Sequence, residues 1–278
     1  MEQMKIADMQ QSANAVAVET FGLNRRFGSS VAVDSLNLRV ASGAIFGLLG
    51  TNGAGKSTTI KMLTTLLAPS TGTARVAGFD VVLQPQEVRR NIGYVSQMLS
   101  ADGQLTGYEN LLISAKIYGI PRMEREKRIK QAIDFIELSS VASTSVSHYS
   151  GGMIRRLEIA QSMLHRPAIL FLDEPTVGLD PVAKHSVWQR IYYLRQEFGT
   201  TIFMTTHDME EADKLCDRVA FMHRGHIVAL DSPVKLKKTI GPEATLDDVF
   251  IHCTGTSIDE RGDYRDAART RHTAERVE

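Results

Sequence analysis

Apolar and polar residues alternate along the early part of the chain, at residues 16–19, 31–33 and 36–40. This alternation is typical of half-buried antiparallel strands, because successive side chains of a strand point to opposite faces. Residues 45–49 are instead continuously apolar, as expected for a strand that is buried on both faces. The pattern therefore predicts antiparallel strands followed by a strand in the interior of the protein.

Helical periodicity begins after residue 100. Thr106 and Glu109 have the spacing of a capping box, which predicts a helix that runs to Tyr118. Further helices are predicted at residues 59–67, 122–138, 150–164 and 183–197, and further strands at residues 169–172, 201–205, 218–222 and 226–230. This order indicates an α/β protein that contains a helical insertion at about residues 100–166.

Composition excludes little and suggests no unusual class of protein. The 278 residues include 32 Lys and Arg against 32 Asp and Glu, so the net charge gives no reason to expect nucleic acid as the main ligand. The two cysteines, Cys216 and Cys253, are expected to be reduced thiols. The longest apolar runs are far shorter than the about 20 residues of a membrane helix. Residues 1–14 lack the apolar core of a signal peptide and are expected to be flexible, and residues 255–278 are expected to form a polar, mobile tail.

Residues 50–58 match the pattern G-x-x-x-x-G-K-[ST] and lie between the buried strand and a predicted helix. Glycines let the backbone wrap closely around phosphate groups, and the start of the following helix directs partial positive charge at the same place. Lys56 would reach the β- and γ-phosphates, and the Ser57 hydroxyl would coordinate Mg²⁺. The predicted phosphate loop consists of Gly50, Thr51, Asn52, Gly53, Ala54, Gly55, Lys56, Ser57 and Thr58.

Two acidic residues, Asp173 and Glu174, stand at the end of the apolar strand at residues 169–172. Successive strand residues point to opposite faces, so the two carboxylates are expected to have different roles. Asp173 is placed to hold Mg²⁺, and Glu174 can act on the water that attacks the γ-phosphate. These features predict a phosphate-loop ATPase or GTPase and do not distinguish the two.

The segment from Tyr149 to Met153, together with Gln97 and His207, makes the chain resemble the ATP-binding cassette family. The resemblance covers residues 15–236, and the motifs follow the order of that family. They are the phosphate loop, a glutamine loop at residues 93–97, a signature at Ser150, Gly151 and Gly152, the acidic strand end at residues 173–175, a D-loop at residues 178–180 and a histidine switch at residues 206–208. A GTPase would need an Asn-Lys-x-Asp guanine-recognition motif, which the sequence lacks.

The resemblance implies the ABC ATPase form of the phosphate-loop NTPase fold, with a mixed sheet core, an antiparallel β subdomain and a helical subdomain. The nucleotide-binding domain would span residues 15–240, with a short extension at residues 241–254. The family also implies roles for single residues. The catalytic residues would be Glu174, His207 and Lys56, and Mg²⁺ would be held by Asp173, Ser57 and Gln97.

The remaining residues would bind the nucleotide or the partner. Asp180 would help join two subunits, and Phe27 would stack on adenine. The ATP bound by a partner subunit would be contacted by Ser150, Gly151 and Gly152.

Two positions of the signature depart from the usual pattern of the family. Tyr149 and Met153 stand where the family usually has Leu and Gln, although the Ser-Gly-Gly centre is intact. This variant, the run at residues 155–160 and the late segment at residues 245–250 look like the drug- and polysaccharide-export branch, also called the type-2 or daunorubicin-resistance group. The resemblance therefore favours an exporter subunit.

The implied partners are a second copy of the chain, or a related cassette, and an integral membrane permease. Residues 98–105 would form part of the groove that receives the permease, and the protein would lie at the cytoplasmic face of the membrane. The alternative is a soluble cassette ATPase that acts on ribosomes or DNA. Such relatives usually carry tandem cassettes or a long coiled-coil insertion, whereas this chain has one phosphate loop, a short insertion and no net positive charge. ATP and Mg²⁺ are the expected cofactors, and no nucleic acid is expected.

Overall fold

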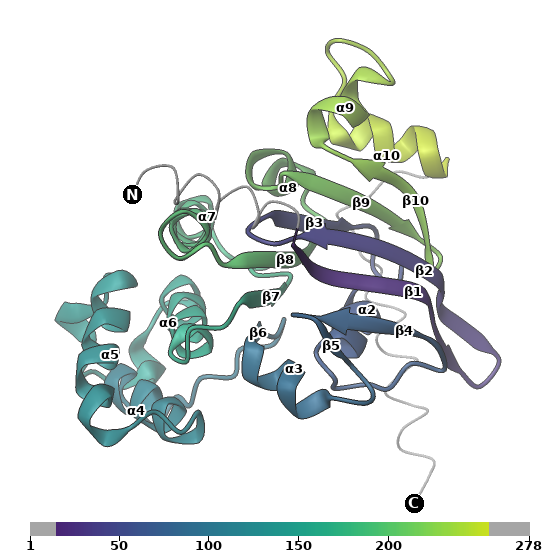
Figure 1. The fold of residues 1–278 in the computed structure, drawn as a ribbon. Coiled ribbons are helices and arrows are strands. Elements are labelled where there is room, and N and C mark those ends of the chain that lie inside the picture. Colours follow the sequence, from purple (N-terminus) through teal and green to yellow (C-terminus); the bar gives the residue numbers. More distant parts are fainter. Residues whose placement is uncertain (1–14, 256–278) are drawn as a thin grey trace, which may run out of the picture.

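The computed structural model describes residues 15–255, so the expected flexible N-terminus and the polar tail from residue 256 onward lie outside the described residues. Two sheets form the body of the protein (Figure 1). The smaller sheet has the order β2-β1-β4-β5 and the larger sheet has the order β10-β9-β3-β8-β7-β6. The strands are β1 (Val16–Phe27), β2 (Ser30–Ala41), β3 (Ile45–Leu49), β4 (Thr71–Val76), β5 (Phe79–Asp80), β6 (Ile92–Val95), β7 (Ile169–Asp173), β8 (Thr201–Thr206), β9 (Arg218–His223) and β10 (His226–Asp231).

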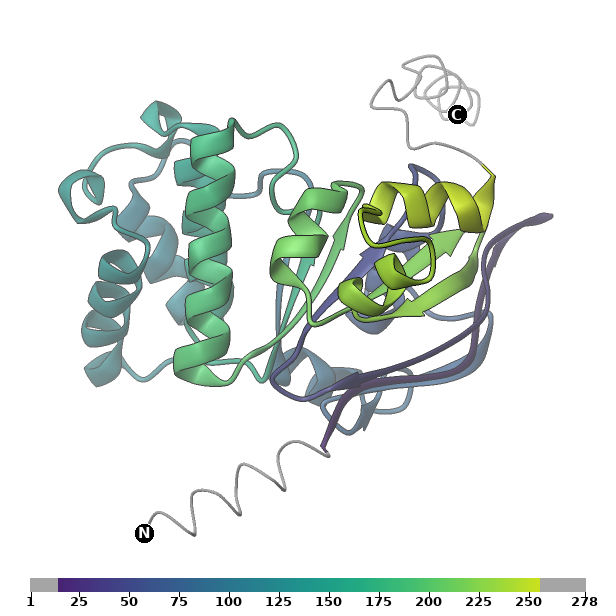
Figure 2. The same ribbon diagram turned by 90° about the horizontal axis from the view of Figure 1, so that it is seen from above.

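The helices fall into two groups. One group packs on the sheets, and the other forms a separate cluster beside them (Figure 2). They are α2 (Lys56–Leu63), α3 (Pro85–Asn91), α4 (Gly107–Ile117), α5 (Arg122–Phe135), α6 (Gly151–Met163), α7 (Pro181–Phe198), α8 (Met209–Leu215), α9 (Pro233–Lys238) and α10 (Leu246–Thr254). No helix between residues 15 and 255 has both the length and the apolar character needed to span a membrane.

The two sheets pack around α2. The smaller sheet is antiparallel throughout, and five strands of the larger sheet are parallel, with only β10 antiparallel at its edge. One buried core joins Ile60 and Leu63 of α2 to apolar side chains of both sheets, among them Val18 and Phe203. Burial of this apolar surface stabilises the fold, and it fixes the start of α2 at the end of β3.

The opposite face of the larger sheet is covered by α6, α7, α8, α9 and α10. A second core contains Leu172 of β7, Ile191 of α7, Leu215 of α8 and Phe250 of α10. A parallel sheet that is buried on both faces needs strands that are apolar throughout, and all residues of β3 and β7 are buried. The α/β fold with a mixed sheet and an antiparallel second sheet, which the sequence predicted, is confirmed.

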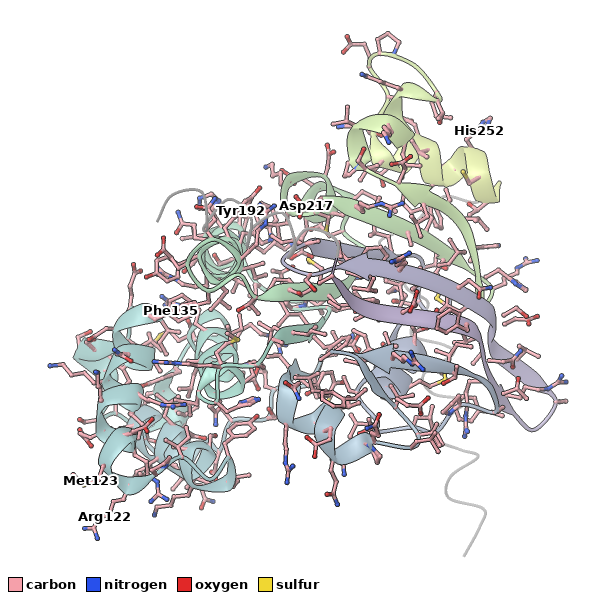
Figure 3. All side chains as sticks on the ribbon, in the orientation of Figure 1. Arg122, Met123, Phe135, Tyr192, Asp217 and His252 are labelled. Carbon is pink, nitrogen blue, oxygen red and sulfur yellow. The ribbon has the colours of Figure 1, made fainter. Side chains whose placement is uncertain are left out.

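The helical cluster consists of α4, α5 and the two short 3₁₀ turns between α5 and α6, together with α6 itself. Helix α6 belongs to both groups, because Ile159 packs in the core of the larger sheet and Leu157 packs in the core of the cluster. The cluster has its own core, which includes Leu111, Ile129 and Leu157. The predicted capping box is present at the start of α4, where the backbone N–H of Glu109 donates to the Thr106 hydroxyl and the Glu109 carboxylate accepts from the Thr106 N–H. Arg122 and Met123 lie at the outer end of this cluster, far from the sheets (Figure 3).

Several predicted boundaries were wrong for local reasons. The strands expected at residues 31–33 and 36–40 are one strand, β2, whose register shifts around Ser35, a residue with a φ of 49°. The helix expected at residues 59–67 begins at Lys56 and ends at Leu63, because Thr65 adopts a φ of 65°. The helix expected to reach residue 138 ends at Phe135 because Glu137 also has a positive φ, 55°.

Candidate functional site

The sheet order brings four chain segments together at one edge. β3, β8, β7 and β6 are neighbouring parallel strands, and their carboxyl ends are level, with Leu49 opposite Thr206, Asp173 opposite Thr205 and Val95 opposite Leu172. Ligands of parallel α/β sheets bind at the carboxyl ends of the strands. The phosphate loop follows β3, Gln97 follows β6, Glu174 follows β7 and His207 follows β8.

The phosphate loop leads directly into α2. Gly55 precedes the helix with a φ of 110°, and a Cβ atom there would collide with the Ala32 carbonyl oxygen, so the position requires glycine. The Lys56 ammonium is buried and contacts the carbonyl oxygens of Gly50 at 2.8 Å and Thr51 at 3.2 Å. The loop thus folds around its own lysine and holds the ammonium beside the N-terminus of a helix, where phosphate is favoured.

Asp173 and Ser57 form the part of the site that suits a metal ion. The Ser57 hydroxyl donates to Asp173 Oδ1 at 3.1 Å, and the Thr205 hydroxyl donates to the same oxygen at 2.6 Å. Mg²⁺ prefers hard oxygen ligands and keeps several of its waters, so one hydroxyl and one carboxylate beside a phosphate site match its requirements. These residues fit Mg²⁺ without a cluster of acidic side chains, and the described residues contain no group of three or more His, Cys, Asp and Glu that could hold a metal.

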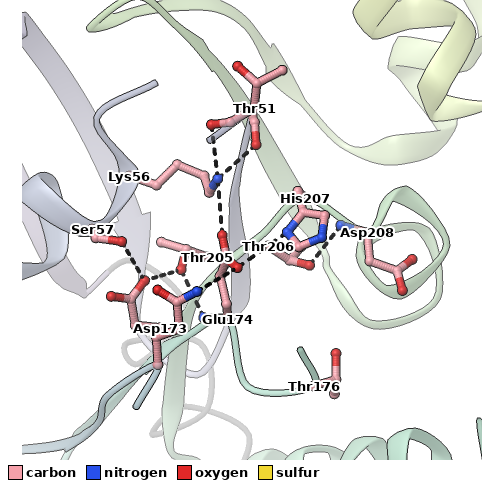
Figure 4. Close-up of polar contacts among 12 residues, drawn as sticks. Thr51, Lys56, Ser57, Asp173, Glu174, Thr176, Thr205, Thr206, His207 and Asp208 are labelled. Atoms are coloured by element: carbon pink, nitrogen blue, oxygen red, sulfur yellow. Dashed lines mark hydrogen bonds and ion pairs between the residues drawn. The ribbon is translucent and has the colours of Figure 1, made fainter. Parts of the chain in front are cut away.

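Glu174 lies at the centre of the polar network (Figure 4). Its φ of 49° is in the left-handed region, which residues other than glycine rarely adopt. Lys56 Nζ lies 3.2 Å from Oε1, while His207 Nδ1 at 3.3 Å and Gln97 Nε2 at 3.4 Å both approach Oε2. All three groups lie far from Glu174 in the sequence, after β3, β6 and β8, so only the fold brings them together.

The charged neighbours of Glu174 control its ionisation. Burial acts to raise the pKa of this carboxyl, but His207 and Lys56 outweigh burial and hold the pKa below its usual value. For His207 the largest influence is the same contact, which raises the pKa of the imidazole against the opposing effect of burial. Glu174 is therefore an ionised carboxylate beside Lys56 and His207, which are also groups suited to contact a γ-phosphate.

The His207 contact predicts a pH-dependent stability of the nucleotide-free protein. The pKa of His207 is higher in the folded protein than in the unfolded chain, where it is about 6.5. The contact therefore contributes its full stabilisation below about pH 6.5, and this stabilisation is lost as the pH rises through the folded-state pKa. The pKa of Glu174 is lowered, so the carboxylate stays ionised across this range. We expect the melting temperature of the wild type to exceed that of His207→Gln near pH 6, with the difference shrinking as the pH rises through the folded-state pKa of His207.

Thermal unfolding of both proteins across this pH range measures the effect. His252→Gln, which changes an exposed histidine of α10, is the control and should follow the wild type at every pH. A difference between wild type and His207→Gln that is the same at all pH values would contradict the assignment.

The signature residues lie elsewhere in the chain. Ser150 caps α6, where its hydroxyl accepts from the Met153 N–H at 3.3 Å, and Gly151 and Gly152 begin the helix. Gly152 has no room for a side chain, because a Cβ atom there would meet the Cβ of Ala183 in α7. Within the described residues no hydrogen bond or ion pair joins these three residues to the phosphate loop. The structure therefore brings Lys56, Ser57, Asp173, Glu174, Gln97 and His207 together and leaves the signature outside this group.

Two further candidates lie apart from the network. Asp180 caps α7, and its carboxylate accepts from the N–H groups of Val182 and Ala183 at 3.0 Å each. Phe27 is about half exposed at the end of β1, with the Arg25 guanidinium 4.6 Å from the centre of its ring. One side of the ring is thus occupied by a cation, and the role of Phe27 at adenine stays a prediction.

The unusual residues of the signature have structural partners. The Tyr149 hydroxyl donates to the Val141 carbonyl at 2.7 Å, and Gly107 of α4 leaves room for that hydroxyl. Met153 accepts from the Ser150 N–H through its sulfur at 3.4 Å, in the position where glutamine would complete a capping box. Both substitutions therefore preserve the start of α6.

Sequence reasoning missed two residues that support the site. Thr205 donates to Asp173 and also accepts from the backbone N–H of Glu174 at 3.0 Å, so its hydroxyl holds the Asp173 carboxylate and the backbone of Glu174. Glu211 of α8 is fully buried and accepts from Thr176 and Trp188, both at 2.9 Å. The sequence could have indicated Thr205, because it places a hydroxyl at the end of an apolar strand. No pattern in the sequence indicates a role for Glu211.

The site consists of a phosphate loop on a parallel sheet, with two carboxylates, a glutamine and a histidine on neighbouring strand ends. Together with the antiparallel second sheet and the helical cluster, it defines the protein as a phosphate-loop ATPase. Comparison with known proteins narrows this class. The ABC transporter family profile matches residues 33–177. The daunorubicin/doxorubicin resistance ATP-binding protein DrrA of Streptomyces peucetius is 44% identical over 225 residues, which cover 81% of this chain and 68% of the relative. The Nod factor export ATP-binding protein I of Mesorhizobium japonicum is 41% identical over 225 residues, which cover 81% of this chain and 66% of the relative.

Solved structures agree with the sequence comparison. The ATP-binding subunit of an ABC transporter superposes with a TM-score of 0.76 at 28% identity, covering 86% of this chain and 99% of the other. A dimeric ATP-binding cassette in a post-hydrolysis state, bound to ADP and Pi, superposes with a TM-score of 0.69 at 25% identity, covering 77% and 98%. The chain belongs to the ABC transporter family, as the resemblance of its motifs implied. It is an ABC ATP-binding subunit that binds and hydrolyses ATP, and the alternative of a ribosome- or DNA-acting cassette is not favoured.

Proposed function

We propose that two copies of this chain clamp two ATP molecules between them and drive export through a separate membrane permease. The observation that carries this proposal is the separation of the signature from the phosphate loop within one chain. Ser150, Gly151 and Gly152 present the N-terminus of a 13-residue helix, which favours an anion, yet the polar network around Lys56 lies elsewhere. A second copy would place its signature over the γ-phosphate held by Lys56.

In each composite site the residues would have distinct tasks. Lys56 would hold the β- and γ-phosphates, and Ser57, Asp173 and Gln97 would hold Mg²⁺, which supplies charge neutralisation on the phosphates when bound. Glu174 would accept a proton from the attacking water, and His207 would orient that water against the γ-phosphate. ATP would displace the contacts of Lys56 and His207 with Glu174, because the γ-phosphate offers both groups a more highly charged partner.

Hydrolysis would release the clamp. The γ-phosphate would join both subunits while it is attached, and its cleavage would remove the anion that the partner signature binds. Asp180 would contribute at the boundary between the subunits, since Gly151 of the signature faces Leu179 of the D-loop and Gly152 packs on Ala183 of α7.

The permease would bind beside Gln97, in a groove that includes residues 98–105. Met98 is 80% exposed and Leu99 is 50% exposed, and large apolar side chains in such positions favour a protein partner. The chain would thus be held at the cytoplasmic face of the membrane through the permease. The names of relatives, which include drug-resistance and Nod factor export ATP-binding proteins, support an exported cargo of drug, polysaccharide or lipid-like character.

Co-expression with a candidate membrane permease tests the proposal. We expect the chain to be retained on the affinity-tagged permease after detergent extraction, and we expect Met98→Asp to reduce that retention by about tenfold or more, because a charge would have to be buried in the contact. Val234→Asp, which changes an exposed apolar residue of α9, is the control and should be retained like the wild type. Equal retention of Met98→Asp, or recovery of the chain with ribosomes or DNA instead, would contradict the proposal.

A further inference from the structure

A buried ion pair lies on α6, one turn beyond the signature. Arg155 Nη1 lies 3.0 Å from Glu158 Oε2, and each side chain is only 3% exposed. Burial lowers the pKa of Arg155, with Glu158 acting in the opposite direction. A buried ion pair rarely adds net stability over apolar residues of similar size, so stability alone does not explain why this pair is present.

Both members of the pair hold the backbone that follows β6. Arg155 donates through Nη1 to the Ser96 carbonyl at 2.6 Å and through Nη2 to the Gln97 carbonyl at 2.8 Å. Glu158 Oε1 accepts from the backbone N–H and the hydroxyl of Ser100 and from the Ala101 N–H. The planar fork of arginine suits two carbonyls and a carboxylate at once, which a lysine ammonium cannot reproduce in the same geometry.

Residues 96–101 depend on these contacts because they lack regular secondary structure. The segment takes part in no backbone–backbone hydrogen bond of the loops and turns within residues 15–255. Its remaining hydrogen bonds are the contact of the Ser96 hydroxyl with the Met98 carbonyl and the contact of Gln97 Nε2 with Glu174. The Arg155–Glu158 pair therefore determines where the backbone of Gln97 lies.

We propose that Arg155 and Glu158 are positioning residues, which set the Gln97 side chain against Glu174 and join its movement to that of the signature helix. One end of α6 begins at Ser150, where a partner's γ-phosphate would bind, and the pair lies within the next two turns of the same helix. A shift of α6 on ATP binding would move the carbonyls of Ser96 and Gln97 with it. This inference rests on the proposed roles of Gln97 and Glu174.

Arg155→Lys in the full-length chain tests the inference. We expect kcat for ATP hydrolysis to fall by about tenfold or more, because a small misplacement of a group at the reacting centre has effects of this size. KM for ATP should change little, since the phosphate loop is untouched. Arg156→Lys is the matched control on the same helix: Arg156 donates to the Ile136 carbonyl in the helical cluster at 2.9 Å, and this variant should hydrolyse ATP like the wild type.

A double-mutant cycle separates positioning from general stability. If Arg155 acts through Gln97, Arg155→Lys should reduce kcat by a much smaller factor in a Gln97→Ala background than in the wild type. Hydrogen exchange should also accelerate at residues 96–101 in Arg155→Lys and not in Arg156→Lys. Glu158→Gln, which keeps the size of the side chain, should reproduce both effects if Arg155→Lys does not fold.

Three results would overturn the inference. They are an unchanged kcat in folded Arg155→Lys and Glu158→Gln, an equal loss of kcat in the wild-type and Gln97→Ala backgrounds, and unchanged exchange at residues 96–101. The proposed role of Gln97 fails separately, if Gln97→Ala alone turns over ATP at the wild-type rate while exchange at residues 96–101 still responds to Arg155→Lys.

Discussion

Glu174→Gln is expected to reduce ATP turnover by about a hundredfold or more while ATP binding is retained. The amide has the shape of the carboxylate but cannot accept the proton of the attacking water, and a positioned general base contributes about 10²–10⁴-fold to a rate. Removing the charge also releases Lys56 and His207 from their contacts with Glu174, at 3.2 and 3.3 Å, so both are free to face the γ-phosphate. Steady-state phosphate release measures the loss of turnover.

The same variant is expected to accumulate as a dimer in the presence of ATP, because the γ-phosphate that joins the subunits is no longer cleaved. Size-exclusion chromatography with and without ATP measures the change in mass. Glu197→Gln, which changes an exposed residue of α7, is the control for removal of one carboxylate and should behave as the wild type. Turnover by Glu174→Gln at the wild-type rate would exclude Glu174 as the base.

Lys56→Ala is expected to abolish measurable hydrolysis and to weaken ATP binding by about tenfold to a hundredfold. A hydrogen bond to a charged group contributes about 1.5–3 kcal/mol, and the ammonium would make such bonds to the phosphates. The change also leaves the buried Glu174 carboxylate with one cationic partner fewer, so the pKa of Glu174 should rise from its lowered value. Titration with a fluorescent ATP analogue measures the affinity, and phosphate release measures the turnover.

Lys61→Ala is the matched control for this experiment. Lys61 belongs to the same helix, α2, but its side chain is exposed and takes no part in the polar network. This variant should bind and hydrolyse ATP like the wild type. Wild-type affinity and turnover in Lys56→Ala would refute the phosphate site, whereas an equal loss in both lysine variants would indicate damage to α2 instead.

Much of this protein could be predicted because its signals are local. The phosphate loop, the capping box at Thr106 and the apolar strands at residues 45–49 and 169–172 each depend on residues that are close in the chain. Local spacing fixes which side chains share a face of a strand or cap a helix, so the fold class and the family followed from the sequence. Three of the boundaries that failed lie at Ser35, Thr65 and Glu137, whose positive φ values no pattern of apolar residues encodes. The strand expected at residues 16–19 also proved longer, because β1 runs to Phe27.

The sequence by itself determined the elements, the phosphate loop and the family of this protein. Only the tertiary structure decided that Gln97, Glu174 and His207 meet, because the order β3-β8-β7-β6 is set by packing between distant strands. The hydrogen bonds of Arg155 and Glu158 with residues 96–101 likewise join segments about 58 residues apart in the sequence. Spacing along the chain carries no information on such contacts, since burial of both sheet faces, and not local preference, brings the segments together.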